Sequence, residues 1–298
     1  MEGQGTLAIE IIEQVPDVDA VLVSVGGGGL IGGINQWLHE RMPKVQVILV
    51  IRNEVEVTHS SGNHGQALAF AAKKFQTQCV VVVPSNAPKA KVQAIEGYGA
   101  KIILVEPTME ARTGKCNELS QKEGLQIVEP HDDWDVMEGQ GTLAIEIIEQ
   151  VPDVDAVLVS VGGGGLIGGI NQWLYERMSK VQVIGVEPEG KNILESIAAG
   201  KRLWTTGTAL DTIADGVRVR ALGEKCFEVM RQVSHKKNNE DIRFAWKLIW
   251  ERLKLVVEPS SALPLAAILK YPQDFKDKSI VLILCGGNVD FVDPSLAQ

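Results

Sequence analysis

The stretch Ala156–Gly169, AVLVSVGGGGLIGG, decides the fold of this chain. Its continuous apolar run predicts a strand covered on both faces, as in a parallel sheet. The four glycines Gly162, Gly163, Gly164 and Gly165 follow, and a helical pattern opens at Leu166. Glycines carry no Cβ, so their backbone N–H groups can crowd a phosphate at the positive end of that helix. A plain strand–helix turn rarely needs four consecutive glycines, and we therefore predict a phosphate site here.

Almost the same stretch occurs earlier in the chain, inside a longer duplicated block. Residues 1–50 return at 137–186, an offset of 136, and differ only at His39/Tyr175, Pro43/Ser179 and Leu49/Gly185. Repeat architectures conserve the apolar positions that stack and let the solvent-facing ones drift. Here both kinds of position match. We interpret the repeat as a duplicated block and not as a solenoid.

Short apolar runs alternate with helical patterns along the chain. We predict strands over 20–25, 45–51, 79–83, 101–105, 156–161, 181–186 and 279–284. We predict helices over 63–75, 90–98, 139–150, 166–178, 240–253 and 260–270. Strands that alternate with helices in this way indicate βαβ units and an α/β fold of parallel sheets covered by helices.

The composition narrows the class of protein. A net charge of −9 argues against a general nucleic-acid or anionic-membrane surface. The four cysteines are widely spaced and form no CxxC pair, which disfavours a zinc site or a disulfide framework. No apolar run is long enough for a membrane span, and the first residues lack the features of a signal peptide. We expect a cytoplasmic protein.

Two further motifs carry polar chemistry. The run His59–Gln66, HSSGNHGQ, follows a strand and leads into a helix whose free N–H groups favour a carboxylate. Cys285–Asn288, CGGN, follows the last strand. A different interpretation remains open at this point. Gly163, Gly165 and Gly168 also satisfy G-x-G-x-x-G, and Glu187 ends the next strand, as in a dinucleotide-binding fingerprint.

Taken together, the motifs resemble the fold-type II pyridoxal-phosphate enzymes, and among them the serine racemase and serine/threonine dehydratase family. The resemblance rests on HSSGNHGQA (59–67), VVPSNAPKAKVQAIEGYGA (82–100), EGQGT (138–142), SVGGGGLIGG (160–169), TIADGV (212–217), WERLKLVVEPSSA (250–262) and CGGN (285–288). These motifs stand in the family's order and span about residues 55–291. The combination is specific, and it makes a dinucleotide-dependent oxidoreductase the least favoured interpretation.

The resemblance implies a pyridoxal 5′-phosphate cofactor and a role for each matching residue. Gly162–Gly165 would hold the cofactor phosphate, Asn63 would bond the pyridoxal hydroxyl, and Cys285 would face the pyridine nitrogen. The group that would bind the substrate carboxylate is Ser60, Ser61, Asn63 and His64. Ser61 matches the serine that moves a proton on the face opposite the lysine. Asp215 and Gly216 would sit by the substrate amine and side chain.

Two expected features are absent from the sequence. The family's Schiff-base lysine stands in an S-F-K-x-R-G type motif some residues before SSGNHG, but here Lys44–Ile51, the end of the duplicated block, occupies that place. Lys44 is a poor substitute for the Schiff-base lysine, because we predict that its equivalent Lys180 lies at the solvated end of a helix-to-strand turn. Some members bind a divalent ion with a Glu and an Asp. Glu187 is present, but Ile193 stands where the Asp is expected, so we predict no metal.

We therefore divide the chain into residues 1–52, an added copy that replaces the family's N-terminal segment, residues 53–136, a small α/β domain, and residues 137–298, a large cofactor-binding α/β domain. The predicted function is that of a serine/threonine ammonia-lyase or a serine racemase with a serine or threonine substrate, as a homodimer. We expect little activity without the lysine. The alternative is a non-catalytic relative that binds a ligand or a sister subunit.

Overall fold

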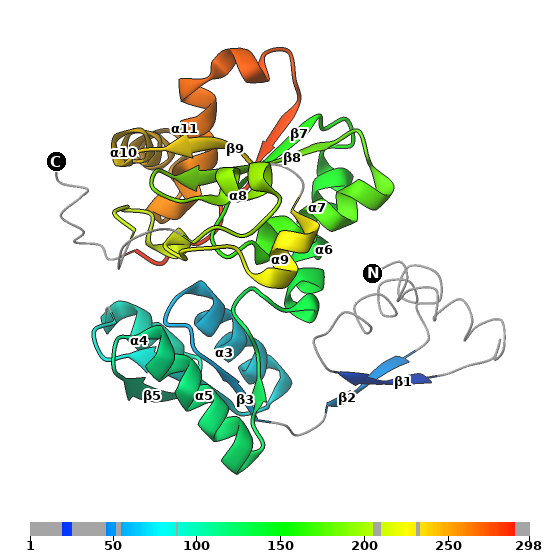
Figure 1. Ribbon diagram of the computed structural model, residues 1–298. Helices are drawn as coiled ribbons and strands as arrows, with labels where there is room; N and C mark the ends of the chain where they lie inside the picture. Colours follow the sequence, from blue (N-terminus) through cyan, green and yellow to red (C-terminus); the bar gives the residue numbers. More distant parts are fainter. Residues whose placement is uncertain are drawn as a thin grey trace.

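The structure is a computed structural model that describes residues 20–25, 46–51, 55–87, 89–204, 210–230 and 233–289. The first glycine loop (26–29) and Lys44, both considered in the sequence, lie outside the described residues. Two four-stranded parallel sheets, each covered by helices, make up most of the molecule (Figure 1). The predicted α/β fold is confirmed.

The large domain is built on a parallel sheet with the strand order β10–β7–β8–β9. Its strands are β7 (Ala156–Ser160), β8 (Gln182–Pro188), β9 (Val233–Lys237) and β10 (Ile280–Leu282). Its α-helices are α6 (Trp134–Gln150), α7 (Gly165–Arg177), α8 (Ile193–Ala199), α9 (Glu224–Val229), α10 (Asn239–Leu248) and α11 (Leu263–Lys270). Shorter turns are η1 (Asp215–Val217), η2 (Ile249–Leu253), η3 (Pro259–Ala262) and η4 (Pro272–Phe275).

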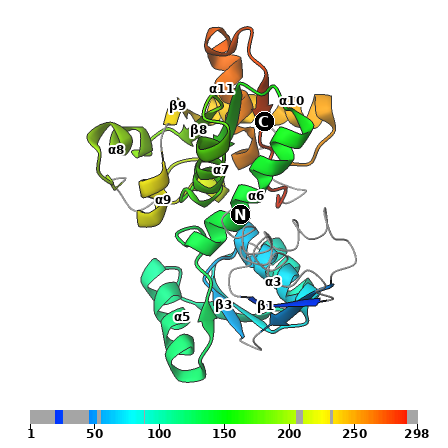
Figure 2. The same ribbon diagram turned by 90° about the vertical axis from the view of Figure 1, so that its right-hand side faces the viewer.

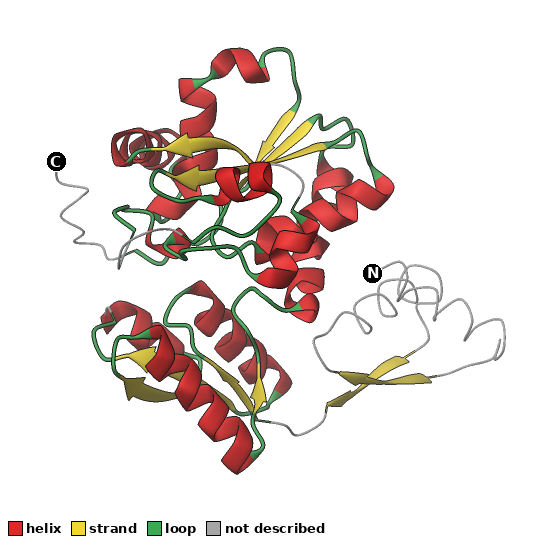
Figure 3. Cartoon of the chain, viewed as in Figure 1, coloured by secondary structure: helices red, strands yellow, loops and turns green. Residues whose placement is uncertain are grey.

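Strand β7 shows why this sheet is buried on both faces. Ala156 and Leu158 point into one apolar cluster together with α10 and α11, whereas Val157 and Val159 point into a second cluster with α6 and α7. Side chains alternate between the faces of a strand, so a strand with apolar residues at every position needs helices on both sides. Figure 3 shows the resulting layers of helix, sheet and helix.

The small domain repeats this plan with the strand order β5–β4–β3–β6, all parallel. Its strands are β3 (Glu56–Thr58), β4 (Cys79–Pro84), β5 (Lys101–Val105) and β6 (Gln126–Ile127). Its helices are α3 (Asn63–Phe75), α4 (Lys89–Gly97) and α5 (Met109–Glu123). Val81 and Val83 pack with α3 and α4, and Val80 and Val82 pack with α5 on the opposite face.

The first copy of the repeat contributes a separate pair of strands. β1 (Ala20–Val25) and β2 (Gln46–Ile51) pair in parallel, with Ala20 opposite Gln46. Ala156 lies opposite Gln182 in β7 and β8, which is the same register at the offset of 136. Among the described strands, β1 and β2 pair only with each other (Figures 1 and 2).

The helix prediction for 63–75 coincides with α3, but other elements were not predicted. α5 is missing from the prediction because its sequence, MEARTGKCNELSQKE, has few apolar residues to mark a buried face. Local residues nevertheless set its two ends. The Thr108 side chain accepts a hydrogen bond from the Ala111 N–H, and Gly124 ends the helix in a left-handed conformation. β9, VSHKK, is a polar edge strand. The predicted boundary between residues 136 and 137 lies within α6.

Helices α6 and α7 cross at two glycines. A Cβ on Gly169 would lie 2.1 Å from the Met137 carbonyl oxygen and 2.7 Å from the Gly141 nitrogen. Only glycine permits this approach. The crossing fixes α7, and therefore the glycine loop at its N-terminus, against α6. Within the described residues, no helix is long and apolar enough to cross a membrane.

Candidate functional site

The site lies where the strand order of each sheet reverses. In the large sheet β7 has β8 on one side and β10 on the other, so the glycine loop after β7 and the CGGN loop after β10 meet at one point. In the small sheet β3 stands between β4 and β6, and the SSGN loop follows β3. Open α/β sheets bind ligands at such positions, outside the carboxyl ends of the strands.

The glycine loop is tightly enclosed on the side of its Cα atoms. Gly164 has φ 103°, and a Cβ there would lie 2.8 Å from Cys226 Cβ. A Cβ on Gly163 would lie within 2.4 Å of the His131 ring. No acceptor within the described residues takes the backbone N–H groups of Gly162, Gly163 or Gly164. The loop therefore offers unpaired donors at the N-terminus of α7.

A buried ammonium lies behind this loop. Lys191 is fully buried, and its Nζ donates to the carbonyl oxygens of Val161, Gly162 and Val217, each at 2.9 Å. Burial lowers the pKa of Lys191 to about 7, against the opposing effect of the Glu187 carboxylate. Glu187 is also fully buried.

The two oxygens of Glu187 accept the N–H groups of Ile193 and Leu194, both at 3.0 Å. A dinucleotide site would need this carboxylate to face a ribose. The structure places it at the start of α8, where it accepts two backbone N–H groups.

The SSGN loop is shaped by a close backbone contact. A Cβ on Gly65 would lie 2.0 Å from the Ser60 carbonyl oxygen, so the first turn of α3 packs directly on the loop. The Ser60 hydroxyl accepts the Gly62 N–H at 3.3 Å, and Ser61 is half-buried in the same turn. These contacts hold the serines at the N-terminus of α3.

Asn63 connects the two domains. Its Nδ2 donates to Glu258 Oε1 at 2.9 Å, and its Oδ1 accepts a hydrogen bond from Asn288 of the CGGN loop. The predicted ligand of the pyridoxal hydroxyl therefore lies beside the loop that carries Cys285. Glu258 was not singled out from the sequence, although it stands in the motif that ends in VVEPSSA.

Three histidines gather between the domains. His59 Nε2 lies 3.0 Å from Glu129 Oε2. Burial lowers the pKa of His64 to about 4, and His59 and His131 lower it further against a backbone hydrogen bond to Val128. His64 Nε2 is buried and makes no hydrogen bond within the described residues. His64 is therefore a neutral imidazole at pH 7.

Cys285 is accessible to solvent but largely enclosed by protein, and this enclosure raises the pKa of its thiol to about 12, with Glu258 adding to the effect. The thiol is thus uncharged at neutral pH. Its neighbour Gly286 fits closely against Asn63, since a Cβ there would lie 2.4 Å from Asn63 Nδ2. Ser261 Oγ donates to the Gly286 carbonyl at 2.9 Å and ties the loop to η3.

Asp215 and Gly216 form η1 on the rim of the site. Asp215 pairs with Lys91, which comes from α4 of the small domain. Gly216 N–H donates to Ser260 Oγ at 2.9 Å, and a Cβ on Gly216 would lie 2.7 Å from Glu258 Oε1. The structure thus brings η1, η3 and the SSGN loop together around Glu258, whose pKa is raised by burial and by Asp215.

Comparison with known proteins supports the resemblance to pyridoxal-phosphate enzymes. The family model for pyridoxal-phosphate dependent enzymes matches residues 1–58 and 52–286. The chain belongs to this family. A serine racemase of Dictyostelium discoideum is 40% identical over 242 residues, covering 78% of this chain and 74% of that protein. A catabolic L-threonine dehydratase of Staphylococcus aureus is 39% identical over 241 residues, 78% of this chain and 69% of that protein.

A solved structure extends the likeness to three dimensions. The structure of maize serine racemase is 36% identical and superposes with a TM-score of 0.75, covering 79% of this chain and 74% of that one. The family model matches each copy of the repeat separately, and the second match spans both four-stranded sheets. The relatives are enzymes, and the family's cofactor is pyridoxal phosphate.

The residues present fit that cofactor at the phosphate and the ring. Unpaired N–H donors in a loop that leaves no space for side chains suit a phosphate group. A thiol that stays protonated suits an uncharged pyridine nitrogen. The sequence missed Lys191, Lys91, His131 and Glu258. Lys191 stands between Gly190 and Asn192, a context that suggests an exposed turn, so nothing local indicates its burial.

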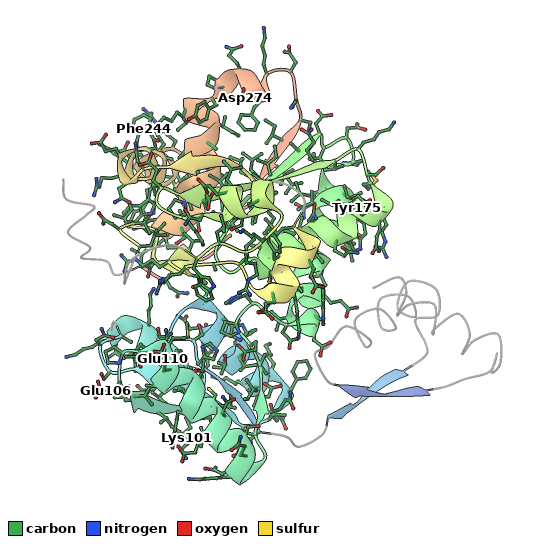
Figure 4. The ribbon with its side chains drawn as sticks, viewed as in Figure 1. Lys101, Glu106, Glu110, Tyr175, Phe244 and Asp274 are labelled. Atoms are coloured by element: carbon green, nitrogen blue, oxygen red, sulfur yellow. The ribbon has the colours of Figure 1, made fainter. Side chains whose placement is uncertain are left out.

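Figure 4 labels side chains of both domains that lie away from the site. Tyr175 and Phe244 lie on the outside of the large domain, and Lys101, Glu106 and Glu110 lie on the small domain. Tyr175 is 56% exposed and occupies one of the three positions at which the two copies differ. Its exposure explains why a change from histidine is tolerated there.

Proposed function

We propose that this chain binds pyridoxal 5′-phosphate in the manner of a serine/threonine ammonia-lyase or serine racemase, and that it keeps the binding half of the site without the reactive lysine. The observation that carries the proposal is the set of N–H groups in Gly162–Gly164 that no described residue accepts. Gly216 packs against this loop and against Glu258, which is the partner of Asn63. When bound, the cofactor supplies an electron sink for negative charge at the substrate Cα.

The residues around the ring orient the cofactor and set its charge. Gly162–Gly165 would hold the phosphate at the N-terminus of α7, and Asn63 would bond the ring hydroxyl. Cys285 would meet the pyridine nitrogen as a neutral thiol, because its pKa is raised to about 12. A neutral partner leaves the nitrogen uncharged and makes the ring a weaker electron sink than a protonated pyridinium.

The SSGN loop would bind the substrate carboxylate. Ser60, Ser61 and Asn63 surround the N-terminus of α3, whose unpaired N–H groups favour an anion. His64 is neutral and can only offer a hydrogen bond, not a charge. The Ser61 hydroxyl would hold or move a proton at the Cα of the substrate. Asp215 and Gly216 would contact the amine and the side chain.

Among the described residues, two lysines reach this region, and the ammonium group of each is already engaged. Lys191 Nζ bonds three carbonyl oxygens on the buried side of the loop, and Lys91 pairs with Asp215. Loss of a general base typically costs a factor of about 10² to 10⁴ in rate, and loss of covalent activation adds to this. We therefore propose noncovalent cofactor binding and slow turnover.

The test combines binding with chemical trapping. Purified full-length protein is titrated with pyridoxal 5′-phosphate by fluorescence, then reduced with borohydride and mapped by mass spectrometry. We expect saturable binding, weakened at least about tenfold in Asn63→Ala and unchanged in the exposed control Asn117→Ala. A reduced adduct on one specific lysine in most molecules would contradict the claim that no lysine serves this site.

Turnover separates the enzyme from a non-catalytic relative. Pyruvate release and D-serine formation from L-serine are measured with saturating cofactor. Activity within tenfold of the serine racemases and dehydratases of the family would contradict slow turnover. Binding of cofactor and serine without product supports the non-catalytic alternative, which the missing lysine motif favours.

Assembly is a separate part of the proposal. The resemblance predicts a homodimer, and sedimentation at several protein concentrations tests it. A sedimentation coefficient that stays at the value of a single chain throughout would contradict a dimer. Cofactor binding can be measured in the same samples, which shows whether assembly and binding are linked.

A further inference from the structure

Lys191 is a fully buried lysine that no predicted role uses. It follows β8, and its ammonium donates to Val161 and Gly162 at the entrance of the glycine loop and to Val217 in η1. Lysine is almost never fully buried unless its charge is partnered. Three carbonyl oxygens at 2.9 Å and the nearby Glu187 charge provide those partners. A pKa of about 7 leaves this amine about half protonated at neutral pH, but only the ammonium form has the three N–H donors that the three carbonyl oxygens accept, so the geometry holds a cation behind the loop.

The position of this cation determines where the loop's donors point. A trans peptide holds its C=O and N–H groups on opposite sides. The Val161 carbonyl shares a peptide with the Gly162 N–H, and the Gly162 carbonyl shares one with the Gly163 N–H. When both carbonyls turn toward Lys191, both N–H groups must turn away from it. The positive charge beside the carbonyl oxygens also polarises these peptides and makes their N–H groups stronger hydrogen-bond donors.

The same ammonium joins the loop to η1. Val217 is the last residue of η1, which carries Asp215 and Gly216, and the Gly216 carbonyl lies 3.3 Å from a Cβ built on Gly162. One charge therefore fixes two segments that meet at the site. Burial lowers the pKa of His131, whose ring lies against Gly163 of the loop, and the Lys191 charge adds a smaller effect in the same direction.

We infer that Lys191 is a positioning residue that orients the N–H groups of Gly162 and Gly163 toward a phosphate monoester and so sets the affinity of the loop for it. The inference rests on the proposed phosphate-binding function of this loop. This lysine distinguishes the segments that follow the two copies of the repeat. At the offset of 136, Val55 corresponds to Lys191 and Ile51 corresponds to Glu187. The first glycine loop therefore has no equivalent lysine in the sequence.

The test removes the ammonium and then returns it. Full-length wild type, Lys191→Ala and the exposed control Lys180→Ala are titrated with pyridoxal 5′-phosphate, with inorganic phosphate and with pyridoxal, which lacks the phosphate. Lys191→Ala should bind both phosphate compounds at least about tenfold more weakly, because two charge-assisted hydrogen bonds lose their orientation. Its affinity for pyridoxal should change less than threefold, and Lys180→Ala should match the wild type.

Propylammonium has the three carbons and the amine that alanine lacks. Millimolar propylammonium should return the affinity of Lys191→Ala for inorganic phosphate, which has no aldehyde to react with the amine, to within about threefold of wild type, and 1-propanol, its uncharged analogue, should not. Equal weakening of phosphate and pyridoxal, or equal rescue by both compounds, would assign Lys191 a purely structural role and overturn the inference.

A second variant shows whether misfolding explains the loss of affinity in Lys191→Ala. Lys191→Arg keeps the charge, and when its circular dichroism matches wild type its phosphate affinity should stay within about tenfold. A folded arginine variant that has lost the preference for pyridoxal 5′-phosphate over pyridoxal overturns the inference. Failure of the proposed function itself looks different, because the wild type would then bind neither phosphate compound.

Discussion

The two copies of the repeat share their sequence and their strand register but not their surroundings. β1 and β2 pair as β7 and β8 do, with Ala20 opposite Gln46 and Ala156 opposite Gln182. β7 and β8 lie inside a four-stranded sheet, flanked by β10 and β9, whereas β1 and β2 pair only with each other among the described strands. The difference teaches that the same sequence can form the same strand pair in different surroundings.

One of the three sequence differences between the copies lies where β8 contacts β9. Gly185 in β8 pairs with Val233 of β9, and the register shifts between Gly185 and Val186. The first copy has Leu49 there. Glycine within a strand often marks a bulge or a close backbone approach, so the second copy carries glycine where its strand must accept an irregular neighbour.

The largest expected effect comes from giving the position directly after the second copy the residue that follows the first copy. Glu187→Ile leaves the Ile193 and Leu194 N–H groups without their acceptor and removes the counter-charge of Lys191. We expect the free energy of unfolding to fall by about 3 to 5 kcal/mol. Chemical denaturation measures it.

The double variant Glu187→Ile/Lys191→Val tests whether these two residues act as a pair. It should be more stable than the sum of the single changes by about 1 kcal/mol or more. Additive effects would mean that the buried carboxylate and ammonium contribute independently.

The helix crossing gives the next largest effect. Gly169→Ala would place a Cβ 2.1 Å from the Met137 carbonyl oxygen, so α6 and α7 must separate. We expect a loss of about 3 kcal/mol in unfolding free energy. The matched change in the first copy, Gly33→Ala, should cost less than about 1 kcal/mol if that copy adds little to global stability. Equal losses would show that both copies are packed alike.

Acid should lower the free energy of unfolding through His64. Burial lowers the pKa of His64 to about 4, so between pH 6.5 and 5 the unfolded chain takes up a proton that the folded chain does not. Stability should fall as pH falls, by about 2 kcal/mol over this range.

His64→Asn can keep the hydrogen bond to Val128 and should flatten the slope, measured as the midpoint of urea unfolding at each pH. His59, His131 and Glu129 face the same group and remain in both proteins. An unchanged slope in the variant would assign the acid sensitivity to those neighbours.

The smallest effect concerns the loops themselves. Gly164→Ala forces a side chain into φ 103° and against Cys226. We expect pyridoxal 5′-phosphate to bind about tenfold more weakly, equivalent to a cost of about 1 to 2 kcal/mol for the left-handed conformation. Gly28→Ala, its counterpart in the first copy, should leave the affinity unchanged. Weaker binding in Gly28→Ala alone would make the first loop the working one.

Most helices and strands were predictable because their signals are local. Continuous apolar runs predicted β4, β5, β7 and β8, and the boundaries of α3 coincide with those predicted. α5 and β9 were missed, since one has few apolar residues and the other is a polar edge strand. Of the site, the motif residues of the resemblance were found, but Lys191, Lys91, His131 and Glu258 were not.

The sequence by itself determined the family, the glycine loop, the missing lysine motif and the two strands within each copy of the repeat, because each of these signals lies in a short stretch of the chain. Only the tertiary structure decided that Lys191 is buried behind that loop, that Asn63 bonds Glu258, and that Glu187 accepts the N–H groups at the start of α8. Burial and partnership arise from segments far apart in sequence. The same fifty residues therefore form a strand pair twice, and the packed surroundings that make a candidate site of the second copy come from the rest of the chain.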